Sequence, residues 1–106
     1  MLYLNDKEEK VIGTFMEIES DFANKTLRLI WNDGIEVVAK YDSFIEDENE
    51  EDFDSEGYEE YWSFVFLSTV PSTEAPIDLS DDGYFTVNYL NFPEIILCGD
   101  KVIYKK

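Results

Sequence analysis

The 106-residue chain has the length of one domain, and its 44% apolar content is too high for a wholly disordered protein. Its 25 acidic and 8 basic residues give a formal net charge of −17, which disfavours direct binding to nucleic acids and anionic membranes. The absence of histidine excludes a Ser-His-Asp triad and a Cys-His pair, so we expect a single domain over residues 1–106 that is not an enzyme.

The first ten residues fit both an extra short strand and a helical turn. They carry no basic region followed by a long apolar run, so they predict no signal peptide. The longest apolar runs span four residues, far short of the ~20 that a membrane helix needs. Cys98 is the only cysteine, and its place at the end of an apolar run predicts a small core residue rather than a reactive thiol. These features predict a cytoplasmic protein.

Apolar and polar residues alternate with period two along much of the chain, which predicts strands. The first half contains three such segments, namely Val11–Ser20, Thr26–Trp31 and Ile35–Tyr41. Asn32-Asp33-Gly34 separates the last two and supplies the glycine that a tight hairpin turn needs. The three segments therefore predict an antiparallel meander.

The second half contains four more predicted strands, namely Tyr61–Val70, Tyr84–Leu90, Glu94–Cys98 and Lys101–Lys105. The first has apolar residues on both faces and so predicts a central strand. A loop bracketed by Pro71 and Pro76 runs to Gly83, and Gly99-Asp100 suits a type II′ turn between the last two strands. We expect an all-β fold of about six to seven strands. A small antiparallel barrel of SH3-like or Sm-like outline would remove exposed strand edges, and a two-sheet sandwich is the alternative.

Acidic residues concentrate in one segment. Residues 41–100 hold seventeen acids and no lysine or arginine, and eleven of those acids lie in residues 42–60. We predict that residues 42–60 form a long loop between the third and fourth strands. Such a charge run is most often a solvated loop that aids solubility. The functional interpretation is a docking surface, because carboxylates steer cationic partners and aromatic side chains supply contact area.

The docking interpretation predicts a non-catalytic module that engages a basic protein or cationic peptide and needs no cofactor. The predicted partner-binding residues are Glu46, Asp47, Glu48, Glu50, Glu51, Asp52, Asp54, Tyr58, Glu59, Glu60 and Tyr61. We expect the strongest contribution where the loop enters the rigid strand at Tyr58–Trp62, although core packing is the simpler role for Trp62.

Calcium binding is the alternative function. Asp52, Asp54 and Glu56, followed by Gly57, match the first half of an EF-hand loop. The second half fails because Ser63 stands where a bidentate glutamate is needed. The three carboxylates are therefore weak candidates for a metal site.

Nucleic-acid mimicry is a sharper form of the docking interpretation, in which the protein fills the nucleic-acid cleft of another protein. An extended segment 42–60 would be too sparse in charge, so mimicry requires an ordered, compact segment and further acids from Asp78, Asp81, Asp82 and Glu94. In length, acidity and strand pattern the chain resembles many uncharacterised bacterial domains. It is also similar in general character to immunity proteins and phage-encoded inhibitors. This likeness is one of composition, so it carries no functional residue over.

Overall fold

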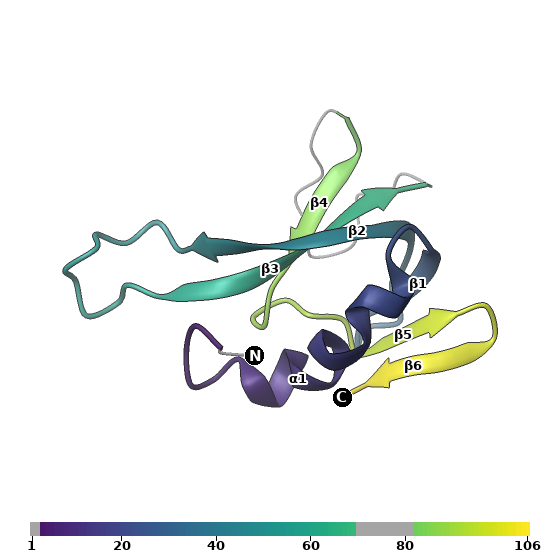
Figure 1. Ribbon diagram of the computed structural model, residues 1–106, viewed down its shortest axis with the longest axis horizontal. Helices are drawn as coiled ribbons and strands as arrows, with labels where there is room; N and C mark the ends of the chain where they lie inside the picture. Colours follow the sequence, from purple (N-terminus) through teal and green to yellow (C-terminus); the bar gives the residue numbers. More distant parts are fainter. Residues whose placement is uncertain (1–2, 70–81) are drawn as a thin grey trace.

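A computed structural model describes residues 3–69 and 82–106 of the chain. These residues form one antiparallel sheet of six strands and one N-terminal helix followed by a short 3-10 turn (Figure 1). The elements are α1 (Glu9–Ile18), η1 (Glu19–Phe22), β1 (Thr26–Ile30), β2 (Glu36–Glu48), β3 (Glu60–Ser68), β4 (Tyr84–Val87), β5 (Ile95–Cys98) and β6 (Lys101–Lys105). The sheet order is β4-β3-β2-β1-β5-β6, so β4 and β6 are its edges.

The strand predicted over Val11–Ser20 is wrong, because this segment forms α1. Ile12, Phe15 and Met16 are buried at the spacing of one helix face, and Thr14 between them is exposed. The period-two pattern placed Thr14 on the apolar face and Phe15 off it. Among residues 3–10, the chain turns before entering α1 at Glu9.

The predicted barrel is also wrong, and so is the two-sheet sandwich. The sheet is open, since its edge strands do not pair with each other among the described residues. α1 takes the place of a second layer by packing its apolar face against the sheet. Phe15 lies edge-on against Tyr41 and Phe64, with ring centroids 5.5 and 5.2 Å apart. Because a helix covers the aromatic face, closure of the sheet is not needed to bury it.

Two predicted hairpins are confirmed. β1 pairs with β2 and β5 pairs with β6, both antiparallel. Gly34 and Gly99 adopt positive φ angles of 85° and 61° in the connecting turns, a conformation that costs glycine little. β4 is shorter than the predicted Tyr84–Leu90 and ends at Val87. Most of the predicted loop at residues 71–83 lies outside the described residues.

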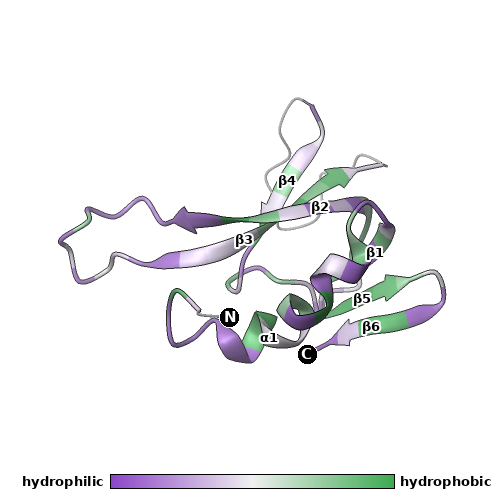
Figure 2. Ribbon diagram, viewed as in Figure 1, coloured by the Kyte–Doolittle hydropathy of each residue, from purple (hydrophilic) through white to green (hydrophobic). Residues whose placement is uncertain are grey.

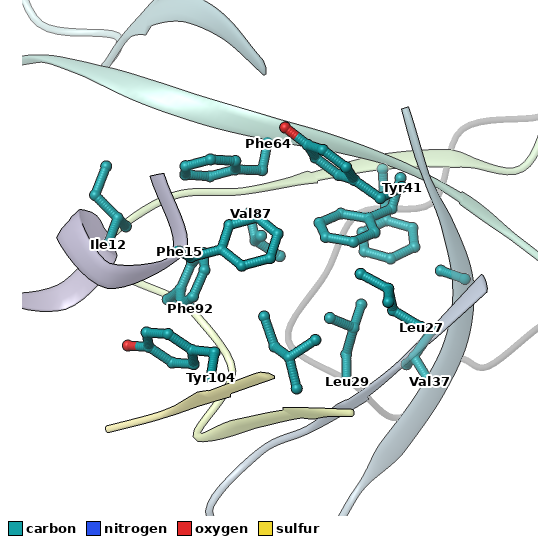
Figure 3. Packing of buried hydrophobic residues seen from close by; sticks show 14 of the residues in the cluster. Ile12, Phe15, Leu27, Leu29, Val37, Tyr41, Phe64, Val87, Phe92 and Tyr104 are labelled. Carbon is teal, nitrogen blue, oxygen red and sulfur yellow. The ribbon is translucent and has the colours of Figure 1, made fainter. Parts of the chain in front are cut away.

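The core lies between α1 and the sheet and is rich in aromatic side chains (Figure 3). Phe92 reaches it from the connection between β4 and β5, with its ring 4.9 Å from that of Tyr104 and 5.6 Å from that of Phe64. Cys98 packs against the same cluster and is half-buried, as predicted for a core residue. In the two described segments, no helix combines the length and apolar character needed to cross a bilayer.

Candidate functional site: an acidic hairpin

The acidic segment is mainly strand. β2 continues to Glu48 and β3 begins at Glu60, and the two pair in register from Phe44↔Phe64 to Glu48↔Glu60. The loop predicted over residues 42–60 is therefore wrong in extent, since only residues 49–59 connect the strands. Cross-strand backbone hydrogen bonds override the poor strand propensity of Asp and Glu here. The end of this hairpin projects beyond the rest of the fold along its long direction (Figure 1).

A bulge at Asp42 sets which face the acids take. Tyr41 pairs with Phe66 and Ser43 pairs with Val65, so Asp42 is an extra residue in β2. The bulge puts Phe44 on the face that Tyr41 occupies before it, and the Phe44 ring lies 5.2 Å from that of Trp62. Side chains two apart share a face of a strand, so Glu46 and Glu48 continue the line of Phe44 beyond the aromatic residues.

The connecting residues 49–59 are ordered by their own hydrogen bonds. Asn49 is the centre of this network: its Nδ2 donates to the Gly57 carbonyl at 2.7 Å, and its Oδ1 accepts from the Glu59 backbone N–H at 3.2 Å. The Asn49 backbone N–H donates to the Glu59 carbonyl at 3.1 Å. The ring of Phe53 lies 5.3 Å from that of Tyr58. The loop thus meets the requirement for order that mimicry imposes.

Four carboxylate side chains and one phenol line an open hollow of about 330 Å³ at the end of the hairpin, namely Glu46, Asp47, Glu48, Glu60 and Tyr58. The Tyr58 hydroxyl donates to Glu48 Oε2 at 2.5 Å. This hydrogen bond raises the pKa of Tyr58 to about 12, with smaller contributions from burial and from the charges of Glu48 and Glu60. The hollow therefore presents carboxylates and one neutral hydroxyl.

The N-terminal segment fastens the base of the hairpin. The fully buried Glu8 carboxylate accepts hydrogen bonds from the backbone N–H groups of Leu4, at 2.9 Å, and Trp62. Asn5 Nδ2 donates to the Glu60 carbonyl at 2.9 Å. Sequence reasoning missed these contacts, because residues 3–8 and 60–62 are far apart in the chain and neither segment carries a motif.

Glu59 joins this base to the acidic surface. Its carboxylate accepts a hydrogen bond from Lys7 Nζ at 2.9 Å and a shared one from the Tyr89 hydroxyl, whose single O–H lies 2.9 and 2.8 Å from the two carboxylate oxygens. The hydrogen bond from Lys7, followed by that from Tyr89, lowers the pKa of Glu59 and keeps it ionised. Within the described residues, Glu59 is thus the only predicted partner-binding residue that forms an ion pair with a cation of its own chain.

The remaining predicted site residues divide into exposed and packed positions. The acids of residues 42–60 are exposed except Asp47 and Glu59, which are half-buried. Tyr61 is only 8% exposed and lies against Tyr89, so it belongs to the core rather than to the surface. Trp62 is half-buried against Phe44, in agreement with the core role considered for it. Phe53 is 81% exposed, which makes it the most accessible aromatic side chain at this end of the molecule.

Charges are segregated across the fold. In residues 3–69 and 82–106 only two ion pairs form, Lys7–Glu59 and Arg28–Glu36. Ten of the eleven acids of residues 42–60 therefore have no ion-pair partner there. Figure 2 shows the end of the β2–β3 hairpin as mostly hydrophilic, with a short hydrophobic stretch in the connecting loop, whereas β1 and β5 alternate or are apolar. Of the acids proposed to supplement the surface, Asp78 and Asp81 lie outside the described residues.

The half-match to an EF-hand lies in the loop that connects β2 and β3. Asp52, Asp54 and Glu56 are all exposed. Across the described part of the chain, no three His, Cys, Asp or Glu side chains are grouped so as to hold a metal ion. The arrangement therefore gives no support to the calcium alternative.

Comparison of the chain with protein-family models, with curated proteins and with solved structures gave no match.

Proposed function

We propose that this protein is a non-catalytic binding module whose acidic hairpin engages a basic surface of a partner protein. The observation that carries the proposal is the ordered hairpin end, where Glu46, Asp47, Glu48 and Glu60 line one hollow and none of them forms an ion pair among the described residues. Like charges directly opposite in a sheet are destabilising, as Glu48 and Glu60 are here. A cationic partner would relieve that repulsion, so part of the binding energy is already stored in the free protein.

Phe53 gives the surface an apolar contact. Its side chain is 81% exposed between Asp52 and Asp54, and the Tyr58 ring supports it from one side. Aromatic side chains surrounded by polar residues are frequent energetic centres of interfaces, and they bind cations through the ring face. The partner that fits this surface has lysine or arginine side chains around a small apolar depression.

An inhibitor or immunity role through mimicry of nucleic acid is the sharper form of this proposal. Pairing compacts the acids, since Glu46 and Glu48 lie about 7 Å apart along β2 and Glu60 faces Glu48 at about 5 Å. Three charges whose ends lie about 7 Å apart give one per ~3.5 Å, about half the density of the one per ~1.7 Å along duplex DNA. The pairing thus raises the charge density above that of an extended segment, in the direction that mimicry requires. A cytoplasmic location stays a prediction from the sequence.

The test compares two variants of equal net charge. One carries Glu46→Gln, Glu48→Gln and Glu60→Gln in the hairpin. The control carries Glu9→Gln, Glu17→Gln and Asp21→Asn, which are exposed positions on α1 and η1. The wild-type protein and the two variants each serve as bait in extracts of the native host. The captured proteins are then purified, and their affinity for each of the three baits is measured by titration.

We expect a basic partner that the wild type and the control retain and that the hairpin variant loses at least tenfold in affinity. Phe53→Ala, introduced alone, should weaken the binding of the same partner without changing the net charge of the protein. Equal retention by the hairpin variant and the control would contradict the proposal, because the position of the acids would then be irrelevant.

A further inference from the structure

Lys7 pairs with a carboxylate at the base of the acidic hairpin, as a basic residue of the proposed partner would. Its ammonium group lies 2.9 Å from the Glu59 carboxylate, and the two residues are 52 positions apart in sequence. Among the described residues no other lysine or arginine forms an ion pair with an acid of segment 42–60. The Lys7 side chain is 71% exposed and that of Glu59 is 23% exposed, so the cation approaches the carboxylate from the solvent side.

Glu59 is kept in position independently of Lys7. The Tyr89 hydroxyl donates its one proton to the Glu59 carboxylate, and the Tyr89 ring packs against Tyr61, with centroids 6.2 Å apart. Tyr61 in turn lies within electrostatic range of Glu59, Asp47, Glu48 and Glu50, so Glu59 contributes to the same negative field as the hairpin end. If Lys7 withdrew, an oriented carboxylate would remain beside the acidic surface.

The N-terminal segment does not depend on Lys7 for its attachment. Glu8 is fully buried and accepts two backbone hydrogen bonds, and Asn5 bonds to the Glu60 carbonyl. An exposed ion pair contributes a factor of only about 1.5 to 5 to an equilibrium. The Lys7 side chain can therefore leave Glu59 while residues 3–8 stay in place.

From these contacts we infer that Lys7 is a built-in competitor: its ammonium group occupies Glu59 in the free protein, and a lysine or arginine of the partner displaces it on binding. This inference rests on the proposed function, and it adds a specific regulation of the same surface. The ion pair lowers affinity for weakly basic surfaces, which must displace Lys7 without enough other contacts to compensate.

The experiment uses a nona-arginine peptide as the cationic probe and isothermal titration calorimetry at fixed, low ionic strength. Lys7→Gln is compared with Lys10→Gln, which removes the same charge from an exposed position without an ion pair among the described residues. Lys7→Arg keeps the competing cation. Glu59→Gln is combined with each glutamine variant to complete a double-mutant cycle.

We expect Lys7→Gln to bind the peptide about 2- to 5-fold more tightly than Lys10→Gln, and Lys7→Arg to bind as the wild type does. In the Glu59→Gln background, Lys7→Gln and Lys10→Gln should bind equally. Equal affinities of Lys7→Gln and Lys10→Gln with Glu59 present would overturn the inference and leave the proposed function intact. If the peptide binds the wild type no better than the Glu46/Glu48/Glu60 glutamine variant, both fail.

Discussion

The two halves of the β2–β3 hairpin are built from the same pair of strands and behave as opposites. Up to the Phe44↔Phe64 pair the hairpin is covered, and Val37, Ala39 and Tyr41 of β2 and Phe64 of β3 are buried in the core. Beyond it, Glu46 and Glu48 lie on the same face and are exposed. The backbone pairing is continuous through both halves apart from the bulge, so the difference lies in the side chains and in what covers them, not in the pairing.

The contrast separates the residues that stabilise the fold from the residues that the fold exposes to solvent. Burial of apolar surface supplies the stabilisation in the covered half, at roughly 25 cal/mol per Å². The uncovered half gains little from burial and loses through charge repulsion. The acidic end of the hairpin is ordered although charge repulsion opposes its folding, and such a local cost in stability is typical of a functional site.

The largest loss of stability should come from removing a buried side chain in the covered half. Phe64 is fully buried, and its ring lies 5.2 Å from that of Phe15 and 5.6 Å from that of Phe92. Phe64→Ala should lower the free energy of unfolding by about 3–5 kcal/mol, because it removes contacts and leaves a cavity. Phe53→Ala, at the exposed end, should change it by less than about 0.5 kcal/mol. Urea unfolding followed by tryptophan fluorescence measures both. Similar losses in the two variants would show that the hairpin end is part of the folding core.

The junction between the halves should be the next most sensitive place. Glu8→Gln keeps one oxygen but presents an amide NH₂ to a second backbone donor, so one of the N–H groups of Leu4 and Trp62 loses its acceptor. We expect a loss of about 1–3 kcal/mol in unfolding free energy. Glu9→Gln makes the same chemical change at an exposed position and should cost less than about 1 kcal/mol. Faster amide exchange at Trp62 should accompany only the first variant; equal stability of the two would rule out this role for Glu8.

The sequence predicted the strands but not the helix, and the reason is local. In α1 the positions 12, 15 and 16 carry the helical signal, while 12, 16 and 18 also fit a strand face. Gly13 is a poor helix former, and no side chain caps the helix N-terminus. α1 is therefore specified by its contacts with Phe64, Phe92 and Tyr41 rather than by propensity.

The candidate site was predicted in outline only. The charge run in residues 42–60 was evident from composition, and most of its acids are exposed as a docking surface requires. Its strand content was missed because acids disfavour strands unless a partner strand fixes them, as β3 fixes β2. The bulge at Asp42 and the contacts of Lys7 and Tyr89 with Glu59 depend on tertiary structure, so no local pattern could indicate them.

A smaller effect on stability should depend on salt in the acidic half of the hairpin. Because Glu60 faces Glu48, Glu60→Gln should stabilise the protein by about 0.2–1 kcal/mol at low ionic strength. Its hydrogen bond with Asn5 uses the backbone carbonyl and is kept. Glu17→Gln on α1 provides the control at an exposed acid outside the hairpin. Unfolding at ~0.01 M and ~1 M salt should show the gain of Glu60→Gln disappearing as screening increases. A gain that persists at high salt would mean that repulsion is not its cause.

The smallest effect concerns two tyrosines whose pKa values are both raised to about 12 for different reasons. The pKa of Tyr58 is raised chiefly by its hydrogen bond to Glu48, and that of Tyr104 chiefly by burial. Since folding favours the protonated phenol in both cases, the associated stability is present below pH ~10 and is lost as the pH rises toward ~12. Glu48→Ala should return the pKa of Tyr58 toward its ordinary value of 10.0 and leave that of Tyr104 unchanged, as followed by the ring Cζ shifts in a pH titration. If both values moved together, the hairpin end and the core would be electrostatically one region, and the separation on which the binding proposal depends would not hold.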